Sequence, residues 1–175
     1  MRLSYQSSRV AEIPPYVFAG INKRKAELAR SGVDVIDLGI GDPDLPTPQH
    51  IVDKLIEEMN DPANFRYSNY HGCLEFREAV ANHYKQRYGV DLDPETEVLT
   101  LIGSKEGIAN FVPAVIDPGD YVLVPDPGYG VYRTATTLAG GNVHHIPLKK
   151  TNHFQPDFTS IPDEILDQAK LMFLN

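Results

Sequence analysis

The amino-acid sequence predicts an α/β fold built on a mainly parallel, doubly wound sheet. Short apolar segments alternate with helical patterns over the second half of the chain, and this alternation is typical of parallel strands joined by crossover helices. Hydrophobic residues make up 42% and charged residues 23% of the chain, which are the proportions of an ordinary globular protein. The length of 175 residues suits one domain or a piece of a larger one.

The N-terminal quarter is expected to hold an extended arm, a helix and a strand. Residues 1–15 lack periodicity and end in two prolines, so we expect them to be extended. Apolar residues recur among basic ones over 16–30, which predicts a helix, and Gly32 follows where a helix C-cap would place it. The apolar run over 33–40 is predicted to be a strand that leads into the loop GDPDLPTP.

Two helices are predicted in the next part of the chain. Thr47 and Pro48 offer an N-cap and a first-turn proline to a helix whose apolar residues share one face. Residues 60–72 are polar and rich in turn formers. A longer helix is predicted over 74–88, with Gly89 at its end.

The C-terminal part is predicted to hold four strands separated by helices. A strand over 97–102 runs into a helix over 104–116, and Pro113 is expected to kink or shorten that helix because proline cannot donate the backbone hydrogen bond. The later elements are a strand over 121–125, a helix over 130–138, a strand over 142–148, a helix over 163–169 and a strand over 171–175. Strands connected in this way require helices on both faces of the sheet.

Charge and composition argue against several classes of function. The chain has 16 Lys and Arg residues against 24 Asp and Glu, a formal net charge of −8, which argues against a nucleic-acid or anionic-membrane surface. The single cysteine, Cys73, excludes an internal disulfide and a multi-cysteine zinc site. The adjacent His144 and His145 would point to opposite faces of a strand, so no metal site is expected. Because no apolar stretch approaches the ~20 residues that span a bilayer and no secretory signal is present, a cytoplasmic location is expected.

The segment LTLIGSKEG is the most informative motif. A predicted strand runs into Gly103, which lets a ligand approach the backbone closely, and Ser104 then opens a helix, where it can cap the helix or donate its hydroxyl. Free amides at a helix start attract an anion. The pattern is neither GxxxxGK(S/T) nor GxGxxG, so a nucleoside-triphosphatase or dinucleotide site is not indicated. Taken alone, the segment is equally consistent with an ordinary capped turn between a strand and a helix.

Three other segments hold candidate site residues in loops. Tyr129, in DPGYGVY, follows a buried strand, so its ring can project above the sheet and stack on a planar ligand. Tyr67, in YSNYHG, carries a hydroxyl that can donate to a phosphate, and Gly41, in GIGDPD, is placed to expose backbone amides to a carboxylate. Each of these segments by itself is equally consistent with a surface turn.

The motifs together carry a resemblance that none of them carries alone. In the order IPPYVFAGI, DLGIGDPDLPTP, LTLIGSKEGIA, VPDPGYGVY and AKLMFLN, they resemble the N-terminal part of the class I/II aminotransferases, which are fold-type-I enzymes dependent on pyridoxal 5′-phosphate (PLP). The resemblance implies an incomplete large domain of that fold in a truncated chain. It assigns residues 1–45 to an N-terminal arm and a segment of the small domain, and residues 46–175 to the N-terminal part of the PLP-binding large domain.

The resemblance also implies roles for individual residues. Ser104 and Lys105 correspond to the residues that bind the cofactor phosphate, and Tyr129 corresponds to the aromatic residue stacked on the pyridine ring. Tyr67 corresponds to a tyrosine that reaches the PLP phosphate of the neighbouring subunit in a homodimer. The positions that match substrate contacts are Tyr16 and Gly41.

The activity implied by the resemblance is transfer of an amino group between an amino acid and a 2-oxo acid through PLP. The Schiff-base lysine falls downstream of Asn175, so no catalytic residue is assigned in this chain and the 175 residues alone are expected to be inactive. The sequence departs from the family at Gly130, where proline is usual, and at Pro113, in a helix that usually lacks proline. Two alternatives stay open: a non-catalytic fragment that dimerises or binds as a half-domain, and another fold-type-I chemistry such as that of a β-lyase.

Overall fold

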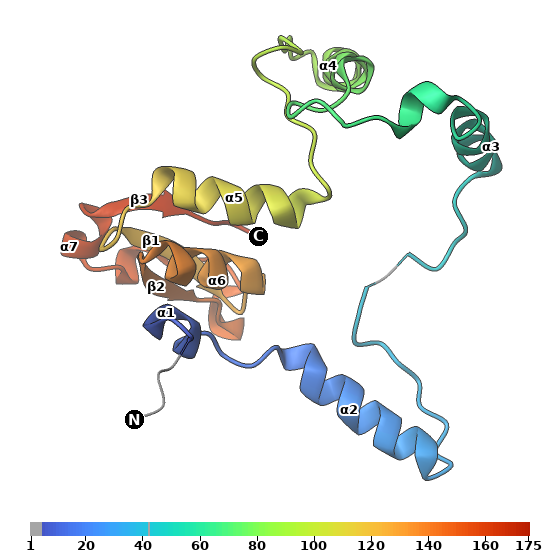
Figure 1. Cartoon of the computed structure of the whole chain (residues 1–175). Helices are drawn as coiled ribbons and strands as arrows, with labels where there is room; N and C mark the ends of the chain where they lie inside the picture. Colours follow the sequence, from blue (N-terminus) through green and yellow to red (C-terminus); the bar gives the residue numbers. More distant parts are fainter. Residues whose placement is uncertain (1–4, 42) are drawn as a thin grey trace. The chain divides into compact units, whose positions relative to one another are not determined.

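The computed structural model describes residues 5–41 and 43–175 (Figure 1). The contacts within the chain divide it into two units. The first unit contains the N-terminal arm up to Pro14 together with residues 101–175, and the second unit contains residues 15–100. The first four residues of the expected arm, and Asp42 of the expected loop, lie outside the described residues. Within the described part of the chain, no helix is long and apolar enough to cross a membrane.

A three-stranded parallel sheet forms the centre of the first unit. Its strands are β1 (Tyr121–Asp126), β2 (Asn142–Pro147) and β3 (Ala169–Met172). The order β2-β1-β3 places β1 in the middle, with a parallel ladder on each side. The register pairs Val122 of β1 with Val143 of β2 and with Leu171 of β3. The other elements of this unit are α1 (Ser8–Ala11), α5 (Ser104–Val115), α6 (Gly130–Ala139), α7 (Asp163–Leu166) and the 3-10 turns η2 (Lys150–Asn152) and η3 (Phe158–Ser160).

Both faces of this sheet are covered by apolar side chains. Successive side chains of β1 point to opposite faces, so each face contributes to its own cluster. Val122 and Val124 belong to an apolar cluster that includes residues of α5 and α6. Leu123, on the other face, packs with Ile146 and Ile161. Full burial of each such side chain stabilises the fold by roughly 1.5–3 kcal/mol. The predicted doubly wound architecture with a parallel sheet is therefore confirmed, with three strands in place of the four expected.

The second unit is helical. Its elements are α2 (Val17–Arg30), α3 (Gln49–Glu58), the 3-10 turn η1 (Pro62–Phe65) and α4 (Leu74–Tyr88). α4 has the predicted length because Gly89 ends it in the left-handed conformation, with φ +70°, and donates its N–H to the Lys85 carbonyl at 3.0 Å. Arg77 of α4 is only 3% exposed. Its guanidinium donates to the Pro94 carbonyl and lies 3.4 Å from the Glu95 carboxylate, which ties α4 to the segment that follows it.

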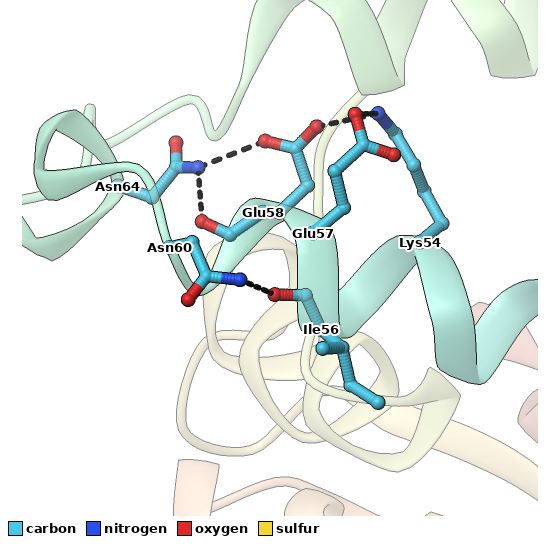
Figure 2. Close-up of polar contacts among 6 residues, drawn as sticks. All are labelled: Lys54, Ile56, Glu57, Glu58, Asn60 and Asn64. Atoms are coloured by element: carbon cyan, nitrogen blue, oxygen red, sulfur yellow. Dashed lines mark hydrogen bonds and ion pairs between the residues drawn. The ribbon is translucent and has the colours of Figure 1, made fainter.

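The C-terminal end of α3 is closed by side-chain hydrogen bonds (Figure 2). Asn60 Nδ2 donates to the Ile56 carbonyl at 2.7 Å, and Asn64 Nδ2 donates to the Glu58 carbonyl at 2.9 Å and to the Glu58 carboxylate at 2.8 Å. Bonds from Lys54 and Asn64 lower the pKa of the Glu58 carboxyl group. Amide side chains thus satisfy carbonyls that the end of a helix leaves unpaired.

The strand predicted over 33–40 is wrong. The Asp37 carboxylate accepts a hydrogen bond from the Gly39 N–H at 3.0 Å and pairs with Lys25 of α2, so the backbone turns locally. Ile36 is 84% exposed and packs into no core. An apolar run becomes a strand only where a neighbouring strand accepts and donates its backbone hydrogen bonds, and no such ladder forms here within the described residues.

The strand predicted over 97–102 is wrong for a similar reason. The Glu97 N–H donates to the Asp93 carbonyl at 2.9 Å, and the Asp93 N–H donates to the Glu97 carboxylate at 2.8 Å. At the other end of the segment, the Ile102 N–H donates to the Glu106 carboxylate. Local acceptors therefore take the backbone donors at both ends of the segment.

Smaller differences concern the ends of elements. The arm that was expected to be extended contains the short helix α1, and Pro48 rather than Thr47 is the N-cap of α3. α5 continues two residues past Pro113, so the proline is accommodated in the last turn of the helix. α7 ends at Leu166, earlier than predicted, and β3 begins at Ala169 because its backbone already pairs with β1 there.

An ion pair joins β3 to the turn before β1, and it predicts a pH-dependent contribution to stability. Lys170 Nζ lies 2.7 Å from Asp120 Oδ2, which also accepts the Asp117 N–H at 2.7 Å. These two bonds, that from Lys170 first, lower the pKa of the Asp120 carboxyl group. A depressed folded-state pKa gives stability that is present above the ordinary aspartate pKa of about 3.9 and is lost as the pH falls through the lower folded value.

We expect Lys170→Met to raise the pKa of Asp120 toward the ordinary range, measured by NMR titration of its carboxyl carbon. Lys149→Met is the matched control, because Lys149 follows β2 at the opposite end of the sheet from Asp120. An unchanged Asp120 pKa in Lys170→Met would contradict the ion pair as its main cause.

Candidate functional site

The start of α5 presents a group of backbone amides suited to an anion. Gly103 is the N-cap, with φ +86°, a conformation that glycine adopts without the cost paid by other residues. Ser104 is the first helical residue, and its hydroxyl makes no hydrogen bond to any residue that the structure describes, which leaves it available to a ligand. The amides of Ser104 and Lys105 have no acceptor within the helix, and the positive end of the helix dipole lies at the same place. We call Gly103, Ser104 and Lys105 the anion cup.

One carboxylate lies in the same first turn of the helix. Glu106 accepts the Ile102 N–H through Oε2, which tethers the carboxylate to the segment that precedes the cup. Glu106 also donates its own backbone N–H to the Gly103 carbonyl at 3.2 Å, so this amide is already used. The amides left for an anion are therefore those at the very beginning of α5.

A cation and an aromatic ring lie beside the cup. Lys105 Nζ is 5.8 Å from the centroid of the Tyr129 ring, within the range of a cation–π contact. Tyr129 is the N-cap of α6 and directly follows the loop after β1, and it is 44% exposed, so part of its ring is open to a ligand. Anion cup, cation and ring together fit a planar aromatic molecule that carries a phosphate, and PLP is such a molecule.

Three residues that were not predicted to belong to the site, Tyr132, Phe173 and Asn175, form a cluster with the Tyr129 ring. The Tyr129 and Tyr132 rings form a T-shaped pair, with centroids 5.8 Å apart and planes at 87°. Tyr132 in turn stacks on Phe173, with centroids 4.2 Å apart and planes at 9°, and its hydroxyl donates to Asn175 Oδ1 at 3.1 Å. Phe173 and Asn175 follow β3, so this cluster lies at the carboxyl end of the sheet, where ligands bind in open α/β sheets. The signal that could have found Asn175 is its position just after a strand.

The loop that carries Tyr129 depends on a glycine. A Cβ atom on Gly128 would lie 2.3 Å from the Pro125 carbonyl oxygen, far inside contact distance. The backbone at residue 128 therefore passes against the end of β1, which fixes the point from which Tyr129 projects. Gly130, two residues later, has nothing within 4 Å of an added Cβ, so it carries no such constraint.

A shallow groove of about 630 Å³ runs between α5 and α6. Apart from Lys105, Glu106 and Thr134 its lining is apolar, and it follows the helix flanks. Few polar groups are present to orient a ligand there. The anion cup and the Tyr129 ring, at the carboxyl end of the sheet, are the better candidate site.

The other three expected site residues belong to the second unit and are described within it. Tyr16 and Tyr67 are both well exposed, and an added Cβ on Gly41 would meet nothing within 4 Å. The loop of Tyr67 ends at Gly72, where a Cβ atom would lie 2.3 Å from Thr100 Oγ1. The structure thus brings together Ser104, Lys105 and Tyr129 of the six expected residues.

Comparison with known proteins identifies the family. The sequence model of the family "Aminotransferase class I and II" matches residues 33–175 of this chain. The chain belongs to this family. The predicted family is therefore confirmed, and so is its cofactor, because class I and II aminotransferases use PLP.

Similar proteins include two named aminotransferases and two solved structures. The LL-diaminopimelate aminotransferase of Moorella thermoacetica is 55% identical over 170 residues, and that of Aquifex aeolicus is 52% identical over 169 residues. Each alignment covers 97% of this chain and 44% of the relative. Substrate-bound BacF from Bacillus subtilis matches with a TM-score of 0.88 at 38% identity, over 98% of this chain and 44% of that one. Aspartate aminotransferase from Thermotoga maritima matches with a TM-score of 0.84 at 30% identity, over 95% and 44%.

These alignments confirm the fold-type-I aminotransferase architecture expected from the sequence. This chain spans less than half the length of the relatives that it matches. The anion cup and the Tyr129 ring lie within the region that the family model covers.

Proposed function

We propose that the protein containing this chain is a PLP-dependent aminotransferase that acts on LL-diaminopimelate, transferring an amino group between this amino acid and a 2-oxo acid in lysine biosynthesis. The proposed substrate is supported by the identity of 52–55% to LL-diaminopimelate aminotransferases over nearly the whole chain. The observation that carries the cofactor site is the contact between Lys105 and the Tyr129 ring beside the start of α5.

Each residue of the site has a task that its chemistry suits. The Ser104 hydroxyl and the amides of the cup donate to the phosphate, and the ammonium group of Lys105 neutralises part of its charge. The Tyr129 ring stacks on the pyridine ring and holds its plane. PLP, when bound, withdraws electrons from the bonds at the substrate's α-carbon. The residues of this chain therefore bind and orient the cofactor.

The second unit supplies residues for substrate and for assembly. We propose that Tyr67 donates its hydroxyl to the PLP phosphate of the neighbouring subunit in a homodimer, which its exposed position on a loop permits. Tyr16 and Gly41 are proposed to contact the substrate. The division into residues 1–45, as arm and small-domain segment, and residues 46–175, as part of the large domain, stays a prediction, as does the cytoplasmic location.

The test of the activity uses the longest natural reading frame that contains this sequence. The purified protein is supplied with PLP, LL-diaminopimelate and a 2-oxo acid, and formation of the new amino acid is followed by chromatography. We expect turnover with LL-diaminopimelate and at least tenfold lower kcat/KM with aspartate. Turnover of aspartate alone would contradict the proposed substrate, and release of pyruvate and a thiol from a thioether amino acid would support β-lyase chemistry instead.

The phosphate role of Ser104 is tested by Ser104→Ala. Loss of one hydrogen bond to a charged group, worth roughly 1.5–3 kcal/mol, predicts a Kd for PLP that rises about tenfold or more, measured by equilibrium dialysis. Ser160→Ala, which removes a hydroxyl bonded to the Asp157 carbonyl in the same unit, is the control and leaves the Kd unchanged. Equal PLP affinity in Ser104→Ala and the unaltered protein would overturn the assignment.

A further inference from the structure

Tyr132 occupies the centre of the aromatic cluster behind Tyr129. It lies in the first turn of α6 and is 7% exposed. The Phe173 ring stacks on the Tyr132 ring with the two planes nearly parallel. The Tyr129 ring meets the Tyr132 ring at nearly a right angle. The plane of the Tyr129 ring is therefore set by contact with a buried ring that is itself held in place.

The hydroxyl of Tyr132 makes a separate contact. It donates to Asn175 Oδ1 at 3.1 Å, which joins the start of α6 to the residues that follow β3. A side-chain amide whose oxygen accepts a hydrogen bond has its orientation fixed, with the N–H₂ group as the remaining donor. Among residues 5–41 and 43–175, no acceptor is found for that Asn175 nitrogen. The Tyr132 contact thus leaves this nitrogen as the donor of the amide.

The backbone holds both partners of this contact. The Tyr132 N–H donates to the Tyr129 carbonyl at 3.0 Å, and Thr136 Oγ1 donates to the Tyr132 carbonyl at 2.8 Å. The Phe173 N–H donates to the Leu123 carbonyl at 2.9 Å, which continues the β1–β3 pairing beyond β3. The hydroxyl–amide bond therefore bridges two anchored segments.

We propose that Tyr132 is a positioning residue of the cofactor site, whose ring sets the plane of Tyr129 and whose hydroxyl fixes the amide of Asn175 as a hydrogen-bond donor. The proposal rests on the proposed function, in which Tyr129 stacks on PLP. A phenylalanine at residue 132 would supply the same stacking, so the hydroxyl–amide bond is a separable part of this role. A buried hydroxyl without a partner is costly, and the bond to Asn175 satisfies it.

The first experiment measures coupling between the two side chains, with PLP as the probe, in the protein encoded by the longest natural reading frame that contains this sequence. We expect Tyr132→Phe to raise the Kd for PLP about three- to tenfold, the range that one hydrogen bond provides. In the Asn175→Ala background, we expect the same change at residue 132 to alter the Kd by less than about twofold, because its partner is gone. Tyr121→Phe, at the opposite end of β1, is the control and leaves the Kd unchanged.

A second experiment reports the positioning without the cofactor. In ¹⁵N-labelled protein, the side-chain amide resonances of Asn175 are expected to shift in Tyr132→Phe and to keep their positions in Tyr121→Phe. Equal effects of Tyr132→Phe on the Kd with and without Asn175, or unchanged Asn175 amide resonances, would overturn the inference alone. Failure of the unaltered full-length protein to bind PLP would overturn both the inference and the proposed cofactor site.

Discussion

Gly128→Ala is expected to lower both the stability of the first unit and its affinity for PLP. The added Cβ would lie 2.3 Å from the Pro125 carbonyl oxygen and 3.2 Å from the carbonyl carbon. Because these are backbone atoms, no side-chain rotation relieves the overlap, and the loop after β1 has to move. Overpacking of this kind costs roughly 1–3 kcal/mol in the free energy of unfolding.

The same displacement moves Tyr129, the next residue, away from the anion cup. We expect the Kd for PLP to rise about tenfold, equivalent to roughly 1.4 kcal/mol of binding free energy. Urea unfolding followed by tyrosine fluorescence measures the stability, and equilibrium dialysis measures the Kd.

Gly130→Ala is the matched control for this variant. Gly130 is the first residue of α6, and an added Cβ there meets nothing within 4 Å. Alanine restricts the unfolded chain, so we expect a stability gain of about 0.5 kcal/mol and an unchanged Kd for PLP. A Gly128→Ala protein that is destabilised but binds PLP as tightly as the unaltered chain would remove Tyr129 from the site.

The fold of the first unit could be predicted well because its signals are local. Val122, Leu123 and Val124 form an apolar run bounded by turn residues, and the structure buries all three in the central strand. Gly103 and Gly140 mark the beginning of α5 and the end of α6 through positive φ angles that glycine favours. Each of these features depends on a few neighbouring residues, so the sequence contains the information needed.

The two strands that were predicted wrongly depend on pairing with a neighbouring strand, which is not a local property of the sequence. The segments 33–40 and 97–102 are as apolar as a strand, yet pairing requires a neighbour at the right distance and register. Asp37 and Glu97 then decide the outcome, because their carboxylates accept nearby backbone N–H groups and favour turns. Hydrophobicity alone cannot distinguish the two results.

The site shows the same division between local and distant information. Ser104, Lys105 and Tyr129 could be nominated because each follows a predicted strand or lies at a helix start. The bond between Tyr132 and Asn175 joins residues 43 positions apart, and only the register of β1 with β3 brings them together. No local pattern of residues places the end of β3 beside the first turn of α6.

Gly72→Ala is expected to be the most destabilising of the glycine substitutions in the second unit. Gly72 has φ +84°, and an added Cβ would lie 2.3 Å from Thr100 Oγ1 and 2.5 Å from Thr100 Cβ. The left-handed conformation costs an alanine about 1–2 kcal/mol, and the overlap with Thr100 adds roughly 1–3 kcal/mol. Thr100 Oγ1 is buried and has no hydrogen-bond partner among the described residues, and this burial confines the threonine where the alanine would press on it.

The contribution of Thr100 can be separated from backbone strain. Gly89→Ala, at the other end of α4, has a similar φ of +70° but nothing within 4 Å of the added Cβ, so it should show only the backbone cost of about 1–2 kcal/mol. Removing the Thr100 side chain in the double variant Gly72→Ala/Thr100→Gly should make the combined loss of stability smaller than the sum of the two single losses. Both comparisons are made by urea unfolding of the unaltered protein, the three single variants Gly72→Ala, Gly89→Ala and Thr100→Gly, and the double variant. If Gly72→Ala is no more destabilising than Gly89→Ala, the close approach of Gly72 to Thr100 adds nothing to the cost of the left-handed conformation.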